Sequence, residues 1–337
     1  MTRTLPANVY TDPLLYERER QEIFARTWQY VGHVGDLIAE GSYIACEIAG
    51  FPVAVVNKGD GLAAFHNVCR HRAGRLLREE RGQCEKALEC TYHGWTYALD
   101  GRLRNARDFG PLEGFDPRDF ALFPLKVATW RGFVFIAMKD PALSLAETLA
   151  PLDARLEGRS FDALMPSGRL RHQIACNWKL YVENYLEGYH IPNVHPALAA
   201  EVDAAAYRVR MEGQVCFHEA PLRHGVRPVY DGLWAWVAPN LGVNVYGEGI
   251  MLERMLPQGL RGSELVYDYF FVPAVAADEA ARGRILNMSE TVTAEDKAVC
   301  EEVQRNIEAG AYVSGVLSSR HEQGVAWFQN FCAGAYR

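Results

Sequence analysis

Hydrophobic and polar positions follow different patterns in successive parts of the chain. In residues 13–28, charged residues alternate with large apolar ones at intervals that predict an amphipathic helix. From residue 30 to residue 138 the pattern changes to short apolar runs separated by turn residues. Residues 52–65 and 90–103 each predict a β-hairpin, because two such runs flank a Gly- or Asp-containing turn. This part is expected to be a small all-β unit.

After Asp140-Pro141 the pattern changes again. Residues 177–190 predict a helix that stops before Pro192, and residues 294–309 predict another, with Thr293 as a possible N-cap. Between them, apolar and polar positions partly alternate in segments that predict strands: 209–217, 233–237, 243–246 and 265–272.

These elements together predict an α+β fold with two domains. The small all-β domain is expected at residues 29–139. The second domain is expected to combine residues 1–28 with 140–337, as an antiparallel sheet flanked by helices in a helix-grip-like arrangement.

Composition narrows the class of protein. The 337 residues include 49% hydrophobic and 23% charged ones, close to a soluble globular average. The net charge is −7 and the basic residues are scattered, which argues against a nucleic-acid partner. The N-terminus lacks a signal-peptide pattern, and no apolar run approaches the roughly 20 residues that span a bilayer, so a cytoplasmic protein without a membrane partner is expected. In that compartment the eight cysteines are expected to be thiols or metal ligands.

Two short loops each offer one cysteine and one histidine, namely Cys69 with His71 and Cys90 with His93. Two thiolates and two imidazoles could bind one zinc ion, or could hold a [2Fe–2S] cluster with the cysteines on one iron and the histidines on the other. The alternation of cysteine and histidine favours the cluster, since mixed zinc sites usually pair like with like. Cys84 lies between the loops with no histidine three residues after it, and is expected to take no part.

A second candidate metal site lies in residues 177–195. Glu183, Glu187 and His190 would share one face of the predicted helix, and Pro192 would let His195 return toward the same point. Two histidines with one distant carboxylate form the facial triad that holds Fe(II) and leaves positions open.

These motifs resemble those of the Rieske-type non-haem iron oxygenases, catalytic (α) subunit. The resemblance rests on residues 67–74, 90–95, 177–195 and 294–304 and extends over nearly the whole chain. It implies a Rieske [2Fe–2S] cluster bound by Cys69, His71, Cys90 and His93, with Trp95 beside it, and one mononuclear Fe(II) bound by His190, His195 and Asp296. Glu295 is the competing third ligand, and Asn184 and Glu187 are the expected catalytic residues.

The same resemblance implies the terminal component of a multicomponent oxygenase. It would use O₂ and electrons from a separate NAD(P)H-dependent flavin/iron–sulfur reductase, because the chain has no Gly-x-Gly-x-x-Gly turn and no plant-type ferredoxin cysteine set. Members of the family assemble as head-to-tail homotrimers. Two functions of other classes remain open: a Rieske electron carrier without oxygenase chemistry, and a zinc-stabilised binding protein.

One departure from the family pattern concerns the substrate. Most members place Asp three residues before the first iron-binding histidine, whereas this chain has Glu187, as does the branch that oxidises choline, betaine and carnitine. Mono-oxygenation or N-demethylation of a quaternary ammonium or N-methyl compound is therefore expected, with hydroxylation of an aromatic or other carboxylic acid as the alternative. Aromatic side chains of the second domain could surround a trimethylammonium group by cation–π contact. The candidate pocket residues are Phe217, Trp234, Trp236, Val243, Tyr246, Met251 and Tyr267.

The resemblance also implies a role for Glu187 between subunits. In the family, the matching carboxylate bridges a cluster histidine of one subunit, here His93, and an iron-binding histidine of its neighbour. The alternative is that Glu187 only orients His190 within its own subunit.

Overall fold

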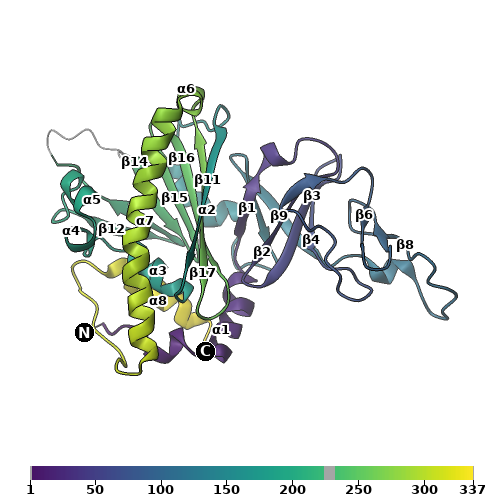
Figure 1. The fold of residues 1–337 in the computed structure, drawn as a ribbon, viewed down its shortest axis with the longest axis horizontal. Coiled ribbons are helices and arrows are strands. Elements are labelled where there is room, and N and C mark those ends of the chain that lie inside the picture. The colour runs from purple at the N-terminus through teal and green to yellow at the C-terminus, as the bar shows by residue number, and fades with distance from the viewer. Residues whose placement is uncertain (1, 224–231, 337) are drawn as a thin grey trace. The chain divides into compact units, whose positions relative to one another are not determined.

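The computed structural model describes residues 2–223 and 232–336, which form two compact units (Figure 1). One unit comprises Phe24–Leu145, and the other combines Met1–Ile23 with Ala146–Arg337. Each unit contains a seven-stranded sheet in which all neighbouring strands are antiparallel. The fold is thus α+β, as the sequence predicts.

The all-β unit consists of its main sheet and a smaller three-stranded sheet. The main sheet has the order β1-β10-β9-β4-β3-β2-β5, with strands β1 (Gln29–His33), β2 (Ser42–Ile48), β3 (Phe51–Asn57), β4 (Leu62–His66), β5 (Arg81–Gln83), β9 (Pro124–Trp130) and β10 (Phe133–Ala137). The smaller sheet has β6 (Leu88–Glu89), β7 (Thr96–Tyr97) and β8 (Leu103–Asn105) in that order. Both predicted hairpins are present, as β3–β4 and as β7–β8.

The sheet of the other unit has the order β11-β17-β16-β15-β14-β13-β12. Its strands are β11 (Met165–Ile174), β12 (Arg208–Glu212), β13 (Val215–Glu219), β14 (Gly232–Val237), β15 (Leu241–Tyr246), β16 (Gly249–Pro257) and β17 (Ser263–Phe271). Its helices are α1 (Pro13–Glu19), α2 (Leu145–Arg155), α3 (Trp178–Tyr185), α4 (Ile191–Val194), α5 (Pro196–Glu201), α6 (Pro273–Ala277), α7 (Glu279–Glu308) and α8 (Gln323–Gly334). The long helix α7 runs across the sheet (Figure 1).

Several elements differ from the sequence prediction. Strands β11 and β16 were not predicted. The single strand expected at 209–217 is two strands, because Gly213 turns the chain with φ +59°. The helix expected over 177–190 ends at Tyr185, and α7 starts at Glu279 rather than near residue 294. No helix among residues 2–223 and 232–336 combines the length and apolarity needed to cross a bilayer.

The N-terminal segment belongs to the second unit because a buried polar cluster holds it there. Glu19 and Lys179 are both fully buried and form an ion pair at 2.6 Å. The Trp178 ring N–H and the Tyr336 hydroxyl also donate to the Glu19 carboxylate. A buried carboxylate needs such partners, so this cluster connects α1 to the start of α3 and to the C-terminal end of the chain.

Candidate metal centres

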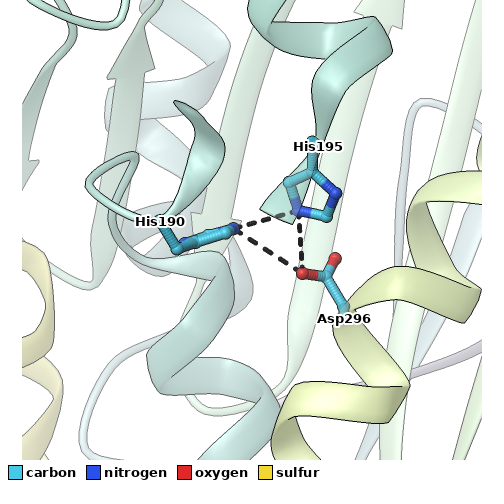
Figure 2. A group of neighbouring side chains, drawn as sticks. All are labelled: His190, His195 and Asp296. Carbon is cyan, nitrogen blue, oxygen red and sulfur yellow. Dashed lines mark hydrogen bonds and ion pairs between the residues drawn. The ribbon is translucent and has the colours of Figure 1, made fainter. Parts of the chain in front are cut away.

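Two histidines and one aspartate meet between α4 and α7 (Figure 2). His190 and His195 stand at the two ends of the four-residue helix α4, so a single turn brings their rings together. Their Nε2 atoms lie 3.1 Å apart, and Asp296 Oδ1 lies 2.9 Å from the Nε2 of His195 and 3.6 Å from that of His190. The ligand atoms all lie within 4.8 Å of one another. Two imidazoles and one carboxylate so arranged can hold an Fe(II) ion on one face.

Each of the three groups is held by a further polar side chain. The ring Nδ1 of His190 hydrogen-bonds Glu187, and the Nδ1 of His195 lies 2.7 Å from Glu295 Oε2. Both Nε2 atoms are thereby left for a metal. The side-chain amide of Asn184 donates to Asp296 Oδ1 at 2.6 Å.

The electrostatics of this site favour a cation. Burial lowers the pKa of His195, but hydrogen bonds and charge from Asp296 and Glu295 outweigh burial, and the net shift of its pKa is upward. The same carboxylates would stabilise a metal ion bound to Nε2.

The structure distinguishes the two adjacent carboxylates that the sequence leaves as rivals. Asp296 faces both Nε2 atoms, whereas Glu295 reaches the opposite edge of the His195 ring. Glu183 also differs from expectation. Because α3 ends at Tyr185, Glu183 does not share a face with His190, and its carboxylate instead accepts a hydrogen bond of 2.8 Å from Tyr10.

We expect Glu295→Gln to weaken iron binding about 10- to 100-fold, because an amide is a poorer acceptor for the His195 Nδ1–H and reduces the basicity of the ring. Anaerobic competition with an Fe(II) chelator measures the affinity. The matched control is Glu302→Gln, an exposed carboxylate on the same helix. Unchanged affinity in Glu295→Gln would show that this contact does not support the metal ligand.

The two Cys–His loops of the all-β unit have the same backbone geometry. In the first loop, the Cys69 N–H donates to the Gly74 carbonyl, and the Cys69 carbonyl accepts from the Ala73 N–H. In the second loop, Cys90 makes the equivalent bonds with Trp95 and Gly94. Ala73 and Gly94 both have positive φ, +57° and +70°. The two loops are therefore a matched pair of tight turns, each presenting one cysteine and one histidine.

The four side chains fit two metal ions better than one. The Cys69 and Cys90 thiols are buried and lie within hydrogen-bonding reach of each other, while the rings of His71 and His93 have centroids 4.6 Å apart. A single zinc ion would bring all four ligand atoms to about 3.4–3.8 Å from one another. Among the described residues, however, only the His190, His195 and Asp296 set has three ligand atoms within 4.8 Å of one another.

Three further observations support a bound cluster at these loops. The Nδ1 of His71 is buried and has no hydrogen-bond partner, which suits a metal ligand. Trp95 stacks on the His71 ring at 4.8 Å with an interplanar angle of 7°. A Cβ on Gly74 would lie 2.9 Å from the Cys90 sulfur, so glycine leaves room beside the thiols. His93, in contrast, is exposed.

A cavity of about 110 Å³ borders His190, His195 and Asp296 in the second unit. Its walls include Asn184 and Glu187 and several aromatic rings, those of Tyr181, Tyr185, Tyr207, Trp234, Tyr246 and Tyr267. Strand alternation explains which residues reach it: His218, Trp234, Asn244, Met251, Glu253 and Tyr267 lie on one face of the sheet in matching register.

Some predicted pocket residues do not line this cavity. Trp234, Tyr246, Met251 and Tyr267 do, but Phe217 and Val243 point to the opposite face of the sheet, and Arg155 covers the Phe217 ring at 3.9 Å. Trp236 is on the cavity face, but it is fully buried beneath Tyr185, with ring centroids 4.7 Å apart.

Three polar residues of the cavity wall were not predicted from the sequence: His218, Asn244 and Glu253. Burial lowers the pKa of His218 to about 3, so its imidazole is neutral. Burial and the charge of Asp296 raise the pKa of Glu253 to about 8, against hydrogen bonding by Tyr181 and Asn244, which lowers it. Two-residue alternation from Met251 could have identified Glu253 as a cavity residue.

Comparisons with known proteins agree with this two-site architecture. Residues 27–116 match the Rieske [2Fe–2S] domain, and residues 161–337 match the ring hydroxylating α subunit (catalytic domain). Choline monooxygenase of Beta vulgaris is 32% identical, covering 96% of this chain and 75% of that protein. The carnitine monooxygenase oxygenase subunit of Escherichia coli K12 is 29% identical, covering 99% and 94%.

Solved structures show the same similarity. A quaternary ammonium Rieske monooxygenase in complex with L-carnitine superposes with a TM-score of 0.87 at 28% identity, covering 99% of this chain and 96% of the other. A naphthalene 1,2-dioxygenase superposes with a TM-score of 0.80 at 19% identity, covering 100% and 93%, a likeness of fold alone.

Proposed function

This chain belongs to the Rieske non-haem iron oxygenases, and we propose that it is the terminal oxygenase of a multicomponent system that mono-oxygenates or N-demethylates a small quaternary ammonium or N-methyl compound. As a member of this family it is an oxidoreductase with one [2Fe–2S] cluster and one mononuclear iron. The electron-carrier and zinc-protein alternatives are excluded, because neither contains the ring-hydroxylating catalytic domain.

In this proposal, residues 29–139 carry the cluster on Cys69, His71, Cys90 and His93, with Trp95 packed beside it. Residues 1–28 and 140–337 carry the iron on His190, His195 and Asp296. When bound, the cluster supplies single electrons and the iron supplies open coordination positions for O₂. Asn184 holds the Asp296 carboxylate, and Glu187 and Glu295 orient the two histidines.

The observation that carries the substrate class is the aromatic lining of the cavity beside the triad. Six aromatic rings surround a space suited to a small molecule. Aromatic faces attract a quaternary ammonium group, which has no N–H to donate, and exclude water from the reacting carbon. The relatives named for choline and carnitine oxidation support the same class.

The proposal includes two partners. A separate flavin/iron–sulfur reductase would supply the electrons. A second copy of this chain, in a head-to-tail homotrimer, would bring its exposed His93 to Glu187. Glu187 already accepts from His190, and its side chain is 11% exposed. The carboxylate also accepts from the backbone N–H groups of Tyr189 and His190, and its two oxygens can accept about four hydrogen bonds, so one from the neighbouring His93 would link the two metal sites.

Single-turnover oxidation tests the substrate class without needing the native reductase. The iron-loaded protein is reduced chemically, freed of reductant, and mixed with O₂ and one compound from a panel of choline, glycine betaine, L-carnitine and benzoate. Mass spectrometry of the products, with a formaldehyde assay, is expected to show oxidation of at least one quaternary ammonium compound and none of benzoate. Oxidation of benzoate alone would overturn the proposal.

A further inference from the structure

Glu253 is a buried carboxylate in the cavity wall with an unsatisfied oxygen. The residue is 2% exposed, and its Oε1 has no hydrogen-bond partner. It lies on β16 opposite Gly242 of β15 and Tyr267 of β17. A Cβ on Gly242 would lie 3.2 Å from Glu253 Oε2, so the glycine leaves space for the carboxylate. A buried carboxylate of this kind is costly unless a partner or a proton neutralises it.

The other charged groups of the cavity are already paired. Among its described lining residues there are three carboxylates and no lysine or arginine. Glu187 is bound to His190, and Asp296 faces His190, His195 and Asn184. Glu253 is therefore the lining carboxylate without a basic partner in the described chain. None of the described lining residues offers a lysine or arginine side chain to a negatively charged ligand.

A second polar atom in the cavity wall also lacks a partner. The His218 Nδ1 lies 2.6 Å from the Tyr207 hydroxyl, while its Nε2 is buried with none. The neutral imidazole can hydrogen-bond a hydroxyl, but it offers no positive charge to a carboxylate. The cavity wall thus has two unsatisfied polar atoms, one on the Glu253 carboxyl group and one on the neutral His218 ring.

Aromatic rings alone do not distinguish a net cation from a zwitterion, because both carry the same ammonium head. The unpaired carboxylate does distinguish them. A bound ammonium group favours the ionised form of Glu253, which attracts that group in either ligand but repels the carboxylate of a betaine or carnitine. That carboxylate also finds no cationic side chain among the described lining residues.

We propose, on the basis of the proposed function, that Glu253 is a specificity-determining residue that pairs with the ammonium group of the substrate and selects net-cationic amino alcohols over zwitterionic amino acids. His218 is placed to receive the hydroxyl of such an alcohol.

Binding to the iron-loaded protein without O₂ tests the proposal. Calorimetric titration compares choline, its uncharged isostere 3,3-dimethylbutan-1-ol, glycine betaine and L-carnitine. In the wild-type protein choline is expected to bind roughly 10- to 100-fold tighter than each of the other three, the range of a charge-assisted buried contact. Betaine or carnitine binding as tightly as choline would overturn the proposal without any variant.

Glu253→Gln keeps the shape of the side chain and removes its charge. It is expected to weaken choline binding by the same factor and to change dimethylbutanol binding by less than about threefold. The matched control is Glu248→Gln, an exposed carboxylate in the β15–β16 turn, which is expected to leave all affinities unchanged. Equal weakening of choline and dimethylbutanol in Glu253→Gln would indicate a packing role and refute the charge selection.

The oxidation products distinguish an incorrect role for Glu253 from an incorrect proposed function. If the protein oxidises betaine or carnitine in preference to choline, the role of Glu253 is refuted and the proposed function stands. If it oxidises only benzoate and binds no ammonium compound, the proposed function itself is refuted.

Discussion

Asp296→Ala is expected to abolish turnover and to lower the iron content from about three to about two per chain, while the [2Fe–2S] cluster stays intact. Among the described residues, Asp296 Oδ1 is the carboxylate oxygen that faces the Nε2 atoms of both His190 and His195. Without it, two neutral imidazoles remain, which hold Fe(II) far more weakly. Iron and acid-labile sulfide analysis measures the loss, and the EPR signal of the reduced cluster reports the other site.

The cluster signal separates this assignment from a general folding defect. Glu302→Ala, a change at an exposed position of the same helix α7, is expected to keep full iron content and turnover. An Asp296→Ala protein that keeps its third iron, or that folds but loses the cluster signal, would show that Asp296 is not the third ligand of the single iron.

Glu187→Gln is expected to keep both metals and the oligomer but to slow reoxidation of the reduced cluster by roughly 100-fold. In the structure Glu187 accepts from His190, and in the proposed trimer it also accepts from His93 of the neighbouring copy. Both carboxylate oxygens are acceptors, so each can accept from one imidazole N–H. Glutamine replaces one of these with an NH₂ donor, so one of the two hydrogen bonds is lost. Stopped-flow absorbance of pre-reduced protein mixed with substrate and O₂ measures the rate.

Glu295→Gln is the informative control for this experiment. Glu295 contacts the Nδ1 of the other iron-binding histidine, His195, just as Glu187 contacts that of His190. When loaded with saturating iron, the Glu295→Gln protein is expected to reoxidise its cluster at nearly the wild-type rate, because Glu295 has no part in the proposed bridge. Wild-type reoxidation with product in Glu187→Gln would mean that Glu187 only orients His190 within its own chain.

Both candidate metal-ligand sets could be proposed from the sequence because each consists mainly of residues close together in the chain. Cys69 with His71, Cys90 with His93, and His190 with His195 are spaced so that one tight turn brings each pair together. Soft thiolates beside imidazoles, and imidazoles beside a carboxylate, restrict the metal chemistry before any fold is known. The α+β class followed similarly from periodicity, which is a local property.

Only the tertiary structure showed which way the side chains of similar candidate residues point. Glu295 and Asp296 are neighbours in sequence, but a helix turns about 100° per residue, so one faces the Nδ1 edge of His195 and the other faces the metal side. Phe217 and Trp234 are both aromatic strand residues, but the register of the sheet places them on opposite faces.

Glu253 is the clearest example of a cavity residue that only the tertiary structure revealed. Strand β16 was not predicted because two charged residues, Glu253 and Arg254, interrupt its apolar run. Burial at those positions depends on partners on the neighbouring strands β15 and β17: Asp268 pairs with Arg254, and Gly242 leaves space for Glu253. The sequence by itself determined which residues are candidate metal ligands, because ligand chemistry and short spacing are local. The shape and charge of the cavity beside them were decided by strand register and helix phase, which exist only once the sheet and α7 have packed together.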